Sequence, residues 1–426
     1  MEIPAFAAIE AQERGVRPGR HERLEHTHPR ATAAVALSLR WKSDEARHTD
    51  CYVANELNLW RDILPPELES GLVGRGVGEV VAHSFEPGAF APAYDERQLM
   101  WLRDDQFNRR FRRGGMVQPR VGRFYPKGIL ERVPGVFSGN MLPFRVTALE
   151  SGRLQADLNH PLAGRPVDVQ AKLLDIWQPR EEHGGVCNDV AETVAANGPG
   201  MQARWRGQST DFWSDLPFVR ADPTPDDRFY AGARLVHHLD ATARRQIGRL
   251  YAGLIPPGGR VLDLMSSWAS HLPEDLETGP VTGLGMNREE LDANSRLTER
   301  VVHDLNREPR LPFPDDAFDA VICTASVEYL VEPFDVFAEV ARILRPGGRF
   351  VVTFSNRRFP PKVIRIWEDM HEFERPGLVV EYFLRCGRFA SLETCSLRGL
   401  PRPADDKYAG RMPFSDPVFA VWAEAV

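Results

Sequence analysis

The chain has 426 residues, 42% of them hydrophobic and 27% charged, which predicts a globular protein of two or three domains. Its formal net charge of -7 argues against a general nucleic-acid binder, because such proteins concentrate Lys and Arg against phosphates. No apolar run approaches the roughly 18 residues that span a bilayer, and the N-terminus lacks the pattern of a secretion signal. The five scattered cysteines contain no C-x-x-C pair, which is typical of a reducing cytoplasm. We therefore expect a cytoplasmic protein that binds neither nucleic acid nor membrane and holds no metal.

The first part of the chain predicts a short polar tail followed by an α+β domain. Residues 1–30 are polar and uneven and are expected to be mobile. After them "TAAVALSLRW" predicts a strand, a short amphipathic helix starts at Pro66, and another strand follows a glycine-bearing turn. The stretch "LPFRVTALESGRLQADLNHPLAGRPVDVQAKLLDI" predicts three strands, separated by turns at 150–152 and 161–164.

Two stretches of this part carry a resemblance to a known family. "ADLNHPLAGRPVDVQAKLLDI" is similar to the last turn and strand of SlyD-type FKBP prolyl isomerases, and "LESGLVGRGVGEVV" resembles their helix and strand. The resemblance implies an FKBP-like domain over residues 31–180, with an inserted lobe at about 93–148 that binds unfolded chains in that family. Leu37 stands where the family has a pocket Tyr, whereas Phe90 and Asp50 match a pocket aromatic and the acidic residue. We expect this fold with little isomerase activity and with a scaffold or partner-binding function.

Two further segments are unusual in composition. The inserted lobe interleaves arginines with aromatic residues, and we favour a solvated face, or a contact with the acidic rest of the chain, over stacking on nucleic acid. These residues are Phe107, Arg109, Arg110, Phe111, Arg112 and Arg113. Residues 181–228 carry Trp205, Phe212, Trp213 and Phe218, which are too many large apolar side chains for a free linker. This connecting segment is predicted to be either a structural strap or a cap over an active site.

Residues 229–426 predict a Rossmann-like α/β domain. A helix with a 3.6-residue apolar rhythm comes first, and five short β-rich runs spaced by helical stretches follow: "RVLDLM", "VTGLGM", "RVVHDL", "FDAVICTAS" and "RFVVTFS". Such alternation predicts a parallel sheet with helices on both faces. The last two runs, "SLETCSLRG" and "PVFAVWAEA", predict an antiparallel terminal pair.

The loop after the first of these strands indicates which cofactor the domain can take. It is "SSWAS", without the glycines that let a backbone approach a pyrophosphate. A cofactor without phosphate, such as S-adenosylmethionine, needs only a small loop with hydrogen-bonding groups. Asp263 at the strand end can accept from its ammonium, and Ser266 and Ser267 supply hydroxyls. Asp304 can accept from the adenine amino group, and the Leu305 amide can reach a ring nitrogen.

This part of the chain resembles class I S-adenosylmethionine-dependent methyltransferases. "VLDLM", "LPFPDDAFDAVIC" and "ILRPGGRFVV" correspond in order to their first strand, the stretch through the fourth, and the helix, turn and fifth strand. The chain departs from the family at the glycine loop and at the ribose-binding acid, where it has Met286 and Asn287. Asn287 can still bond the hydroxyls, and Trp268 can pack against the cofactor. The predicted cofactor-binding residues are Asp263, Met265, Ser266, Ser267, Trp268, Met286, Asn287, Asp304, Leu305 and Thr324.

The methyl acceptor is less defined by the sequence. Methyl transfer is an in-line displacement that depends on alignment and on exclusion of water. Glu328, Tyr329 and His237 are candidate catalytic residues, and His238 and Asp240, on the same predicted helix as His237, are further candidates for a base. No amine-binding or metal-binding signature is present, so we expect a small soft nucleophile, such as a thiol. The alternatives are a protein substrate presented by the FKBP-like domain, and a non-enzymatic chaperone or scaffold.

Overall fold

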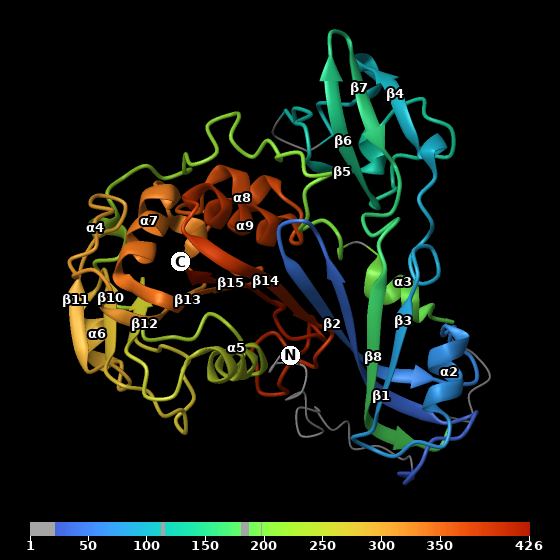
Figure 1. Ribbon diagram of the computed structural model, residues 1–426, viewed down its shortest axis with the longest axis horizontal. Helices are drawn as coiled ribbons and strands as arrows, with labels where there is room; N and C mark the ends of the chain where they lie inside the picture. The colour runs from blue at the N-terminus through green and yellow to red at the C-terminus, as the bar shows by residue number, and fades with distance from the viewer. Residues whose placement is uncertain (1–21, 112–115, 180–186, 197) are drawn as a thin grey trace.

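The computed structural model describes residues 22–426 except 112–115, 180–186 and 197. Within these residues, one sheet of 11 strands runs through the molecule in the order β11-β10-β9-β12-β13-β15-β14-β2-β1-β8-β3. A separate four-stranded sheet, β4-β7-β6-β5, lies at the top of the view in Figure 1. The two halves of the chain therefore share one sheet and do not form separate sheets.

The N-terminal half contributes four antiparallel strands to the large sheet. Their bounds are β1 Thr32–Lys42, β2 Arg47–Asn58, β3 Val80–Phe85 and β8 Val167–Trp177, with helices α2 Pro66–Leu72 and α3 Val190–Ala195. β1 lies between β2 and β8, and its first eight residues are all buried. Its Ala34 and Ala36 pack toward the C-terminal half, while Val35 and Leu37 pack toward α2 and α3. Both faces of β1 are covered, which explains why its apolar alternation is weak in the sequence.

The small sheet is built from the chain between β3 and β8. Its strands are β4 Leu99–Arg103, β5 Phe124–Pro126, β6 Pro143–Glu150 and β7 Arg153–Asp157. Three short 3-10 helices flank these strands: η2 Glu96–Gln98, η3 Asp104–Gln106 and η4 Lys127–Ile129. It has a core of its own that includes Phe107 and Phe144. Arg109 of the predicted basic cluster pairs with Asp104 at 2.6 Å, and Arg112 and Arg113 lie outside the described residues.

Residues 22–30 correct one expectation. They were expected to belong to a mobile polar tail, but Leu24 donates its backbone N–H to Ile176 at 3.0 Å, alongside the end of β8. Thr27 is buried, and its hydroxyl donates to the Leu72 carbonyl at the end of α2. Backbone pairing and one capping hydroxyl hold this stretch although it has few apolar residues. Residues 1–21 lie outside the described part of the chain.

The C-terminal half forms the predicted mixed sheet. Its strands are β9 Val261–Leu264, β10 Val281–Gly285, β11 Glu299–Val302, β12 Phe318–Thr324, β13 Leu344–Phe354, β14 Phe389–Arg398 and β15 Val418–Ala425. β9 to β13 are parallel, and β15 runs antiparallel between β13 and β14. The helical segments are α4 Asp226–Phe229, α5 Ala241–Leu254, α6 Arg288–Ala293, η5 Val327–Tyr329, α7 Pro333–Ile343, α8 Arg365–Asp369 and α9 Glu374–Cys386. α7 and α9 pack on one face and α5 on the other.

The halves meet where β14 pairs with β2 in parallel. The register runs from Glu393 opposite Arg47 to Arg398 opposite Tyr52. Asp50 lies in the middle of this junction, where its buried carboxylate accepts from Trp41 Nε1 at 2.9 Å, Gln202 Nε2 at 2.9 Å and Ser396 Oγ at 2.6 Å. One carboxylate thus ties together β1, β14 and the connecting segment.

We expect Asp50→Ala to lower the free energy of unfolding by about 3 kcal/mol, because it leaves three buried donors without an acceptor. Asp168→Ala is the matched control, since Asp168 accepts a serine hydroxyl at an exposed site, and it should cost less than about 0.5 kcal/mol. Urea denaturation followed by circular dichroism measures both. Equal losses in the two variants would show that the Asp50 contacts add nothing to the junction.

Candidate active site

A cavity of about 160 Å³ lies at the carboxyl edge of the C-terminal sheet. Its wall is formed where β9, β10 and β12 end and where the chain continues from β11. In open α/β sheets this edge is where ligands bind, because the loops of successive parallel strands converge there. The ten residues predicted to bind the cofactor all line this cavity: Asp263, Met265, Ser266, Ser267, Trp268, Met286, Asn287, Asp304, Leu305 and Thr324.

Asp263 is the buried carboxylate of the cavity. It is the next-to-last residue of β9, is 2% exposed, and accepts from the Ser266 hydroxyl at 2.6 Å. Burial raises its pKa to about 6, while the serine hydroxyls of Ser266 and Ser270 act in the opposite direction. A carboxylate removed from water in this way gains from a cationic partner, which the described protein residues do not provide.

The loop after β9 is held by side chains rather than by glycines. Met265 adopts a φ of 58°, and Asn294 donates through Nδ2 to the Ser267 carbonyl and to the Ser270 hydroxyl, both at 2.9 Å. The close approach falls on the neighbouring strand, because a Cβ on Gly285 of β10 would lie 2.1 Å from the Ser266 carbonyl oxygen. The glycine that is missing from the loop after β9 is therefore found in β10, as Gly285 of the stretch "VTGLGM". An acidic side chain at position 285 is excluded for the same reason.

Asn287 was predicted to bond the ribose hydroxyls of the cofactor, but its side chain makes contacts within the protein. Its Oδ1 accepts from the Glu290 backbone N–H at 3.1 Å, so it caps α6. Its Nδ2 donates to the backbone carbonyls of Tyr230 at 2.9 Å and Ala231 at 3.2 Å. Both amide hydrogens of Asn287 are thus engaged by the segment that covers the cavity, and only the second lone pair of Oδ1 is left for a ribose hydroxyl.

That cover is formed by residues 229–239. Tyr230, Arg234, Val236, His237, His238 and Leu239 line the cavity from this side. The Trp268 indole donates to the Val236 carbonyl at 3.2 Å, and His237 stacks on Trp268 with ring centroids 4.3 Å apart. Glu290 accepts from the Arg234 backbone N–H at 2.7 Å. The sequence signal for this cover was the aromatic and basic stretch "FYAGARLVHH", which precedes the helix cap at Asp240.

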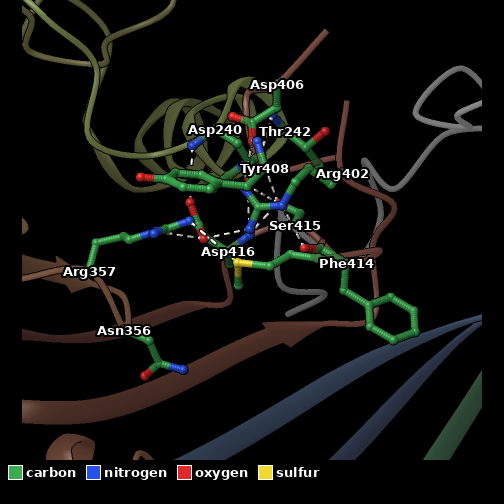
Figure 2. A network of polar contacts seen from close by, with 12 residues as sticks. Asp240, Thr242, Asn356, Arg357, Arg402, Asp406, Tyr408, Phe414, Ser415 and Asp416 are labelled. Atoms are coloured by element: carbon green, nitrogen blue, oxygen red, sulfur yellow. Dashed lines mark hydrogen bonds and ion pairs between the residues drawn. The ribbon is translucent and has the colours of Figure 1, made fainter. Parts of the chain in front are cut away.

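Both ends of the cover are fixed by buried ion pairs. At the first end Asp226 accepts from Arg220 at 2.8 Å and lies 3.2 Å from the ammonium of Lys362, which is fully buried. At the other end Asp240 caps α5, and its carboxylate accepts from Ser415, as Figure 2 shows. Arg402 then joins Asp240 at 3.3 Å to Asp416 at 2.7 Å.

Asp240 is therefore excluded as a base by its place in this network. The predicted helix also begins later than expected: α5 starts at Ala241, so His237 and His238 precede it in an irregular stretch. Both imidazoles line the cavity mouth. Partial burial lowers the pKa of His237, with a further contribution from Arg244, and it lowers the pKa of His238, with a further contribution from Arg234. Both are neutral at neutral pH and able to accept a proton.

Trp213 does not cover this cavity. Its ring lies 5.2 Å from that of Phe334 on α7 and 6.3 Å from that of Tyr382 on α9, with the Arg385 guanidinium 3.9 Å above it. Of the predicted connecting segment 181–228, Asp226 is the residue that lines the cavity among those described. Trp213 and Phe218 thus form a strap over α7 and α9, and the expected cap lies further along the chain.

Glu328 and Tyr329 follow β12 but face different surroundings. Tyr329 lines the cavity, and its hydroxyl oxygen accepts from the Phe359 backbone N–H at 2.8 Å. Burial raises its pKa well above the ordinary range. Glu328 is fully buried, is not among the lining residues, and has no hydrogen-bond partner for either carboxylate oxygen within the described part of the chain. Burial raises its pKa to about 7, although Arg375 and Arg358 act to lower it.

Two polar residues of the predicted cofactor set are already bonded within the wall. The Asp304 carboxylate accepts from the Asn306 backbone N–H at 3.0 Å, and the Thr324 hydroxyl lies 2.6 Å from that of Tyr251. The second Asp304 oxygen is therefore left for a ligand.

Among the described residues, no group of three or more His, Cys, Asp or Glu side chains has a metal-binding arrangement. No described helix is long and apolar enough to cross a membrane.

Comparison with known proteins identifies the cavity-bearing part. A family model described as "Methyltransferase domain" matches residues 266–352. Over 127 residues the chain is 36% identical to a fatty-acid O-methyltransferase of Mycolicibacterium smegmatis, covering 28% of this chain and 42% of the relative. It is 33% identical over 127 residues to a phosphatidylethanolamine N-methyltransferase of Cereibacter sphaeroides, covering 28% of this chain and 61% of the relative.

The chain thus spans about half the length of the curated relatives it matches. A solved SAM-dependent methyltransferase from Aquifex aeolicus aligns at 17% identity with a TM-score of 0.29, covering 44% of this chain and 92% of that one. Residues 266–352, which supply most of the cavity lining, match the methyltransferase-domain model, and this match supports S-adenosylmethionine as the cofactor.

We expect Glu328→Gln to become more stable relative to the native chain as the pH rises. The folded pKa of about 7 lies above the ordinary value of 4.5, so the native chain loses stability as the pH rises from 4.5 through 7. The difference between the two chains should grow by about 3 kcal/mol between pH 4 and pH 8. Urea denaturation at both pH values measures it.

The matched control is Glu332→Gln, at an exposed position just before α7. It makes the same chemical change at a carboxyl that is exposed to solvent, so the comparison isolates the effect of burial at Glu328. A pH-independent difference for Glu328→Gln would mean that the Glu328 carboxyl ionises as easily in the folded chain as in the unfolded one.

Proposed function

We propose that the chain transfers a methyl group from S-adenosylmethionine to a small-molecule acceptor in this cavity. The observation that carries the proposal is the convergence of ten residues, chosen from the sequence for this cofactor, on one cavity at the carboxyl edge of a methyltransferase domain. When bound, S-adenosylmethionine supplies an activated methyl group on a sulfonium.

The donor set of the cavity suits this cofactor better than a dinucleotide. The backbone N–H of Ser266, which a phosphate would need, donates to the Leu284 carbonyl at 2.7 Å. The nearby carboxylate of Asp263 repels phosphate and attracts an ammonium. We assign Asp263 to the ammonium and Asp304, with the Leu305 amide, to the adenine edge. Met265 and Met286 offer soft apolar contacts, and Trp268 offers an aromatic face that can hold a cation.

Residues 229–239 serve the reaction by excluding water. Bound S-adenosylmethionine would supply the methyl group for an in-line displacement, and His237 or His238 at the cavity would take the proton of the acceptor. Water would compete with the acceptor for the methyl carbon and solvate the attacking atom. The stacked pair His237 and Trp268 closes the cavity on the side of the β9 loop, and Phe359 with Tyr329 borders it on the other.

For the acceptor we propose an easily deprotonated nucleophile, such as a thiol. The neutral imidazoles of His237 and His238 at the mouth are weak bases, which suffice for a thiol but are poorly matched to an unactivated hydroxyl. Glu328 is withdrawn from the cavity, so it does not serve as the base. The curated relatives named above act on oxygen and nitrogen, which makes hydroxyl and amine acceptors the main rivals.

A second candidate is a protein acceptor or partner held by the N-terminal half. In its favour, a lobe with its own core emerges between β3 and β8, at the place where the resemblance to SlyD-type FKBP proteins implies one. The residues matched to the isomerase pocket are used for packing, because Phe90 is buried against Phe85 and Asp50 is enclosed by three donors. These contacts favour a scaffold over an isomerase.

We expect the purified chain to transfer labelled methyl groups to small thiols faster than to phenols, amines or peptides. Incubation with methyl-labelled S-adenosylmethionine and matched panels of these acceptors measures the rates. Preferred labelling of peptides would support the protein-acceptor candidate. Absence of transfer to every class would favour a non-enzymatic scaffold.

We expect affinity for S-adenosylhomocysteine to fall about tenfold per pH unit below pH 6 and to be constant above it. Asp263 must be ionised to receive the ammonium, and its pKa in the free protein is about 6. Asp263→Asn should weaken binding at pH 7.5 by roughly 10- to 100-fold and remove the pH dependence. Isothermal titration calorimetry from pH 5 to pH 8 measures both effects.

Asp275→Asn is the control, since Asp275 is an exposed aspartate of the same charge that lies outside the cavity lining. It should bind as the native chain does at every pH. If Asp263→Asn behaved like this control, Asp263 would not contact the ammonium.

A further inference from the structure

Arg234 is a cation on the cavity wall without a carboxylate partner. It belongs to the cover formed by residues 229–239, is half-buried, and lines the cavity. Among the described residues, no carboxylate oxygen is within ion-pairing distance of its guanidinium, and its one side-chain hydrogen bond runs from Nη2 to the Phe229 carbonyl at 2.8 Å. A guanidinium offers five N–H donors, so most of this donor capacity is unused.

The side chain is nevertheless held in place. Its backbone N–H donates to Glu290 Oε1 at 2.7 Å, which fixes the residue on the cover. The guanidinium carbon lies 4.5 Å from the ring centroid of Phe229 and 5.4 Å from that of Phe359. Stacking of this kind orients the planar group and leaves its edge for a ligand. A positioned edge of this sort matches a carboxylate in a bidentate arrangement.

Three of the four carboxylates that line the cavity are engaged by other groups, and the fourth, Asp304, keeps one oxygen for a ligand. Asp226 is paired with Arg220 and Lys362, and Asp263 accepts from Ser266. Glu290 uses one oxygen for the Arg234 backbone and the other for the Ser267 hydroxyl at 2.6 Å. The positive charge of Arg234 is therefore not neutralised within the wall, although it is partly withdrawn from water. Such a charge favours an anionic ligand in the cavity.

We propose that Arg234 is the subsite for a carboxylate of the ligand bound in this cavity. The inference rests on the proposed methyltransferase function, which offers two sources of such a group. One is the carboxylate at the amino-acid end of the cofactor, and the other is a carboxylate on the acceptor. In both cases a carboxylate of the bound ligand contacts Arg234 on the cover, so binding also holds residues 229–239 closed over the cavity.

The test compares Arg234→Gln with Arg244→Gln by calorimetry at pH 7.5. Arg244 is a half-buried arginine of α5 that does not line the cavity, so the control makes the same change of charge nearby. Three probes are titrated: S-adenosylhomocysteine, 5′-methylthioadenosine, which lacks the amino-acid carboxylate, and benzoate, with and without saturating S-adenosylhomocysteine. Thermal melts verify folding, and Arg234→Lys, which retains the charge, replaces the glutamine variant if that variant does not fold.

A loss of roughly 10- to 100-fold for S-adenosylhomocysteine with unchanged 5′-methylthioadenosine binding assigns the cofactor carboxylate to Arg234. Unchanged binding of both nucleosides with loss of benzoate binding assigns a carboxylate of the acceptor. Identical behaviour of the two glutamine variants toward all probes overturns the proposal. If the native chain binds neither nucleoside, the proposed function fails separately, and benzoate binding to the free chain still decides whether the subsite exists.

Discussion

The parallel pairing of β2 with β14 is the constraint on which the rest of this structure depends. It joins a four-stranded antiparallel sheet to a mixed sheet of seven strands, and apolar residues of both halves share one cluster beside it. Residues Ala36 and Cys51 of the N-terminal strands belong to the same apolar cluster as Leu250 of α5. Without β2, strand β14 would be an exposed edge with unpaired backbone groups and uncovered apolar side chains. The halves are therefore parts of one folding unit at this seam.

The junction also determines how the cavity is closed. Asn55, near the end of β2, donates to the Gly399 carbonyl at 2.6 Å, where the chain leaves β14. From there the loop between β14 and β15 carries Arg402 and Asp416, which fix Asp240 at the start of α5 (Figure 2). Asp240 directly follows the cover over the cavity. A chain of buried polar contacts thus runs from the N-terminal half to the ligand site, and each contact is strengthened by its low-dielectric surroundings.

The cavity holds a carboxylate and a guanidinium that do not pair with each other or, within the described part of the chain, with another charged side chain. Asp263 lies buried at the end of β9 on one side, and Arg234 lies on the cover on the other, with neutral histidines at the mouth between cover and loop. A carboxylate and a guanidinium that each lack an opposite charge are costly in an apolar wall and are tolerated where a ligand supplies the partners. A ligand with an amino-acid end carries both an ammonium and a carboxylate and is complementary to this arrangement.

The sequence by itself determined the strands of the C-terminal half and ten of the residues that line its cavity. Alternating β-rich and helical runs are local signals, and the carboxyl ends of parallel strands must meet at one edge, so residues placed at strand ends, such as Asp263 and Asp304, converge. The loop residues Ser266 and Ser267 followed from the same rule. Local patterns are sufficient for such inferences because they depend on neighbours along the chain.

Only the tertiary structure decided which segments come together over long distances. The contact between Asp50 and Ser396 joins residues 346 positions apart, and no local pattern specifies which strand edge β2 will meet. The same holds for the cover, since Asn287 could be predicted to face the cavity but not to be engaged by the backbone at Tyr230. Trp213 shows the reverse case: its apolar ring required burial, but the available surface was that of α7 and α9 rather than the cavity. Hydrophobicity predicts that a side chain is buried, whereas the shape of the folded chain decides where.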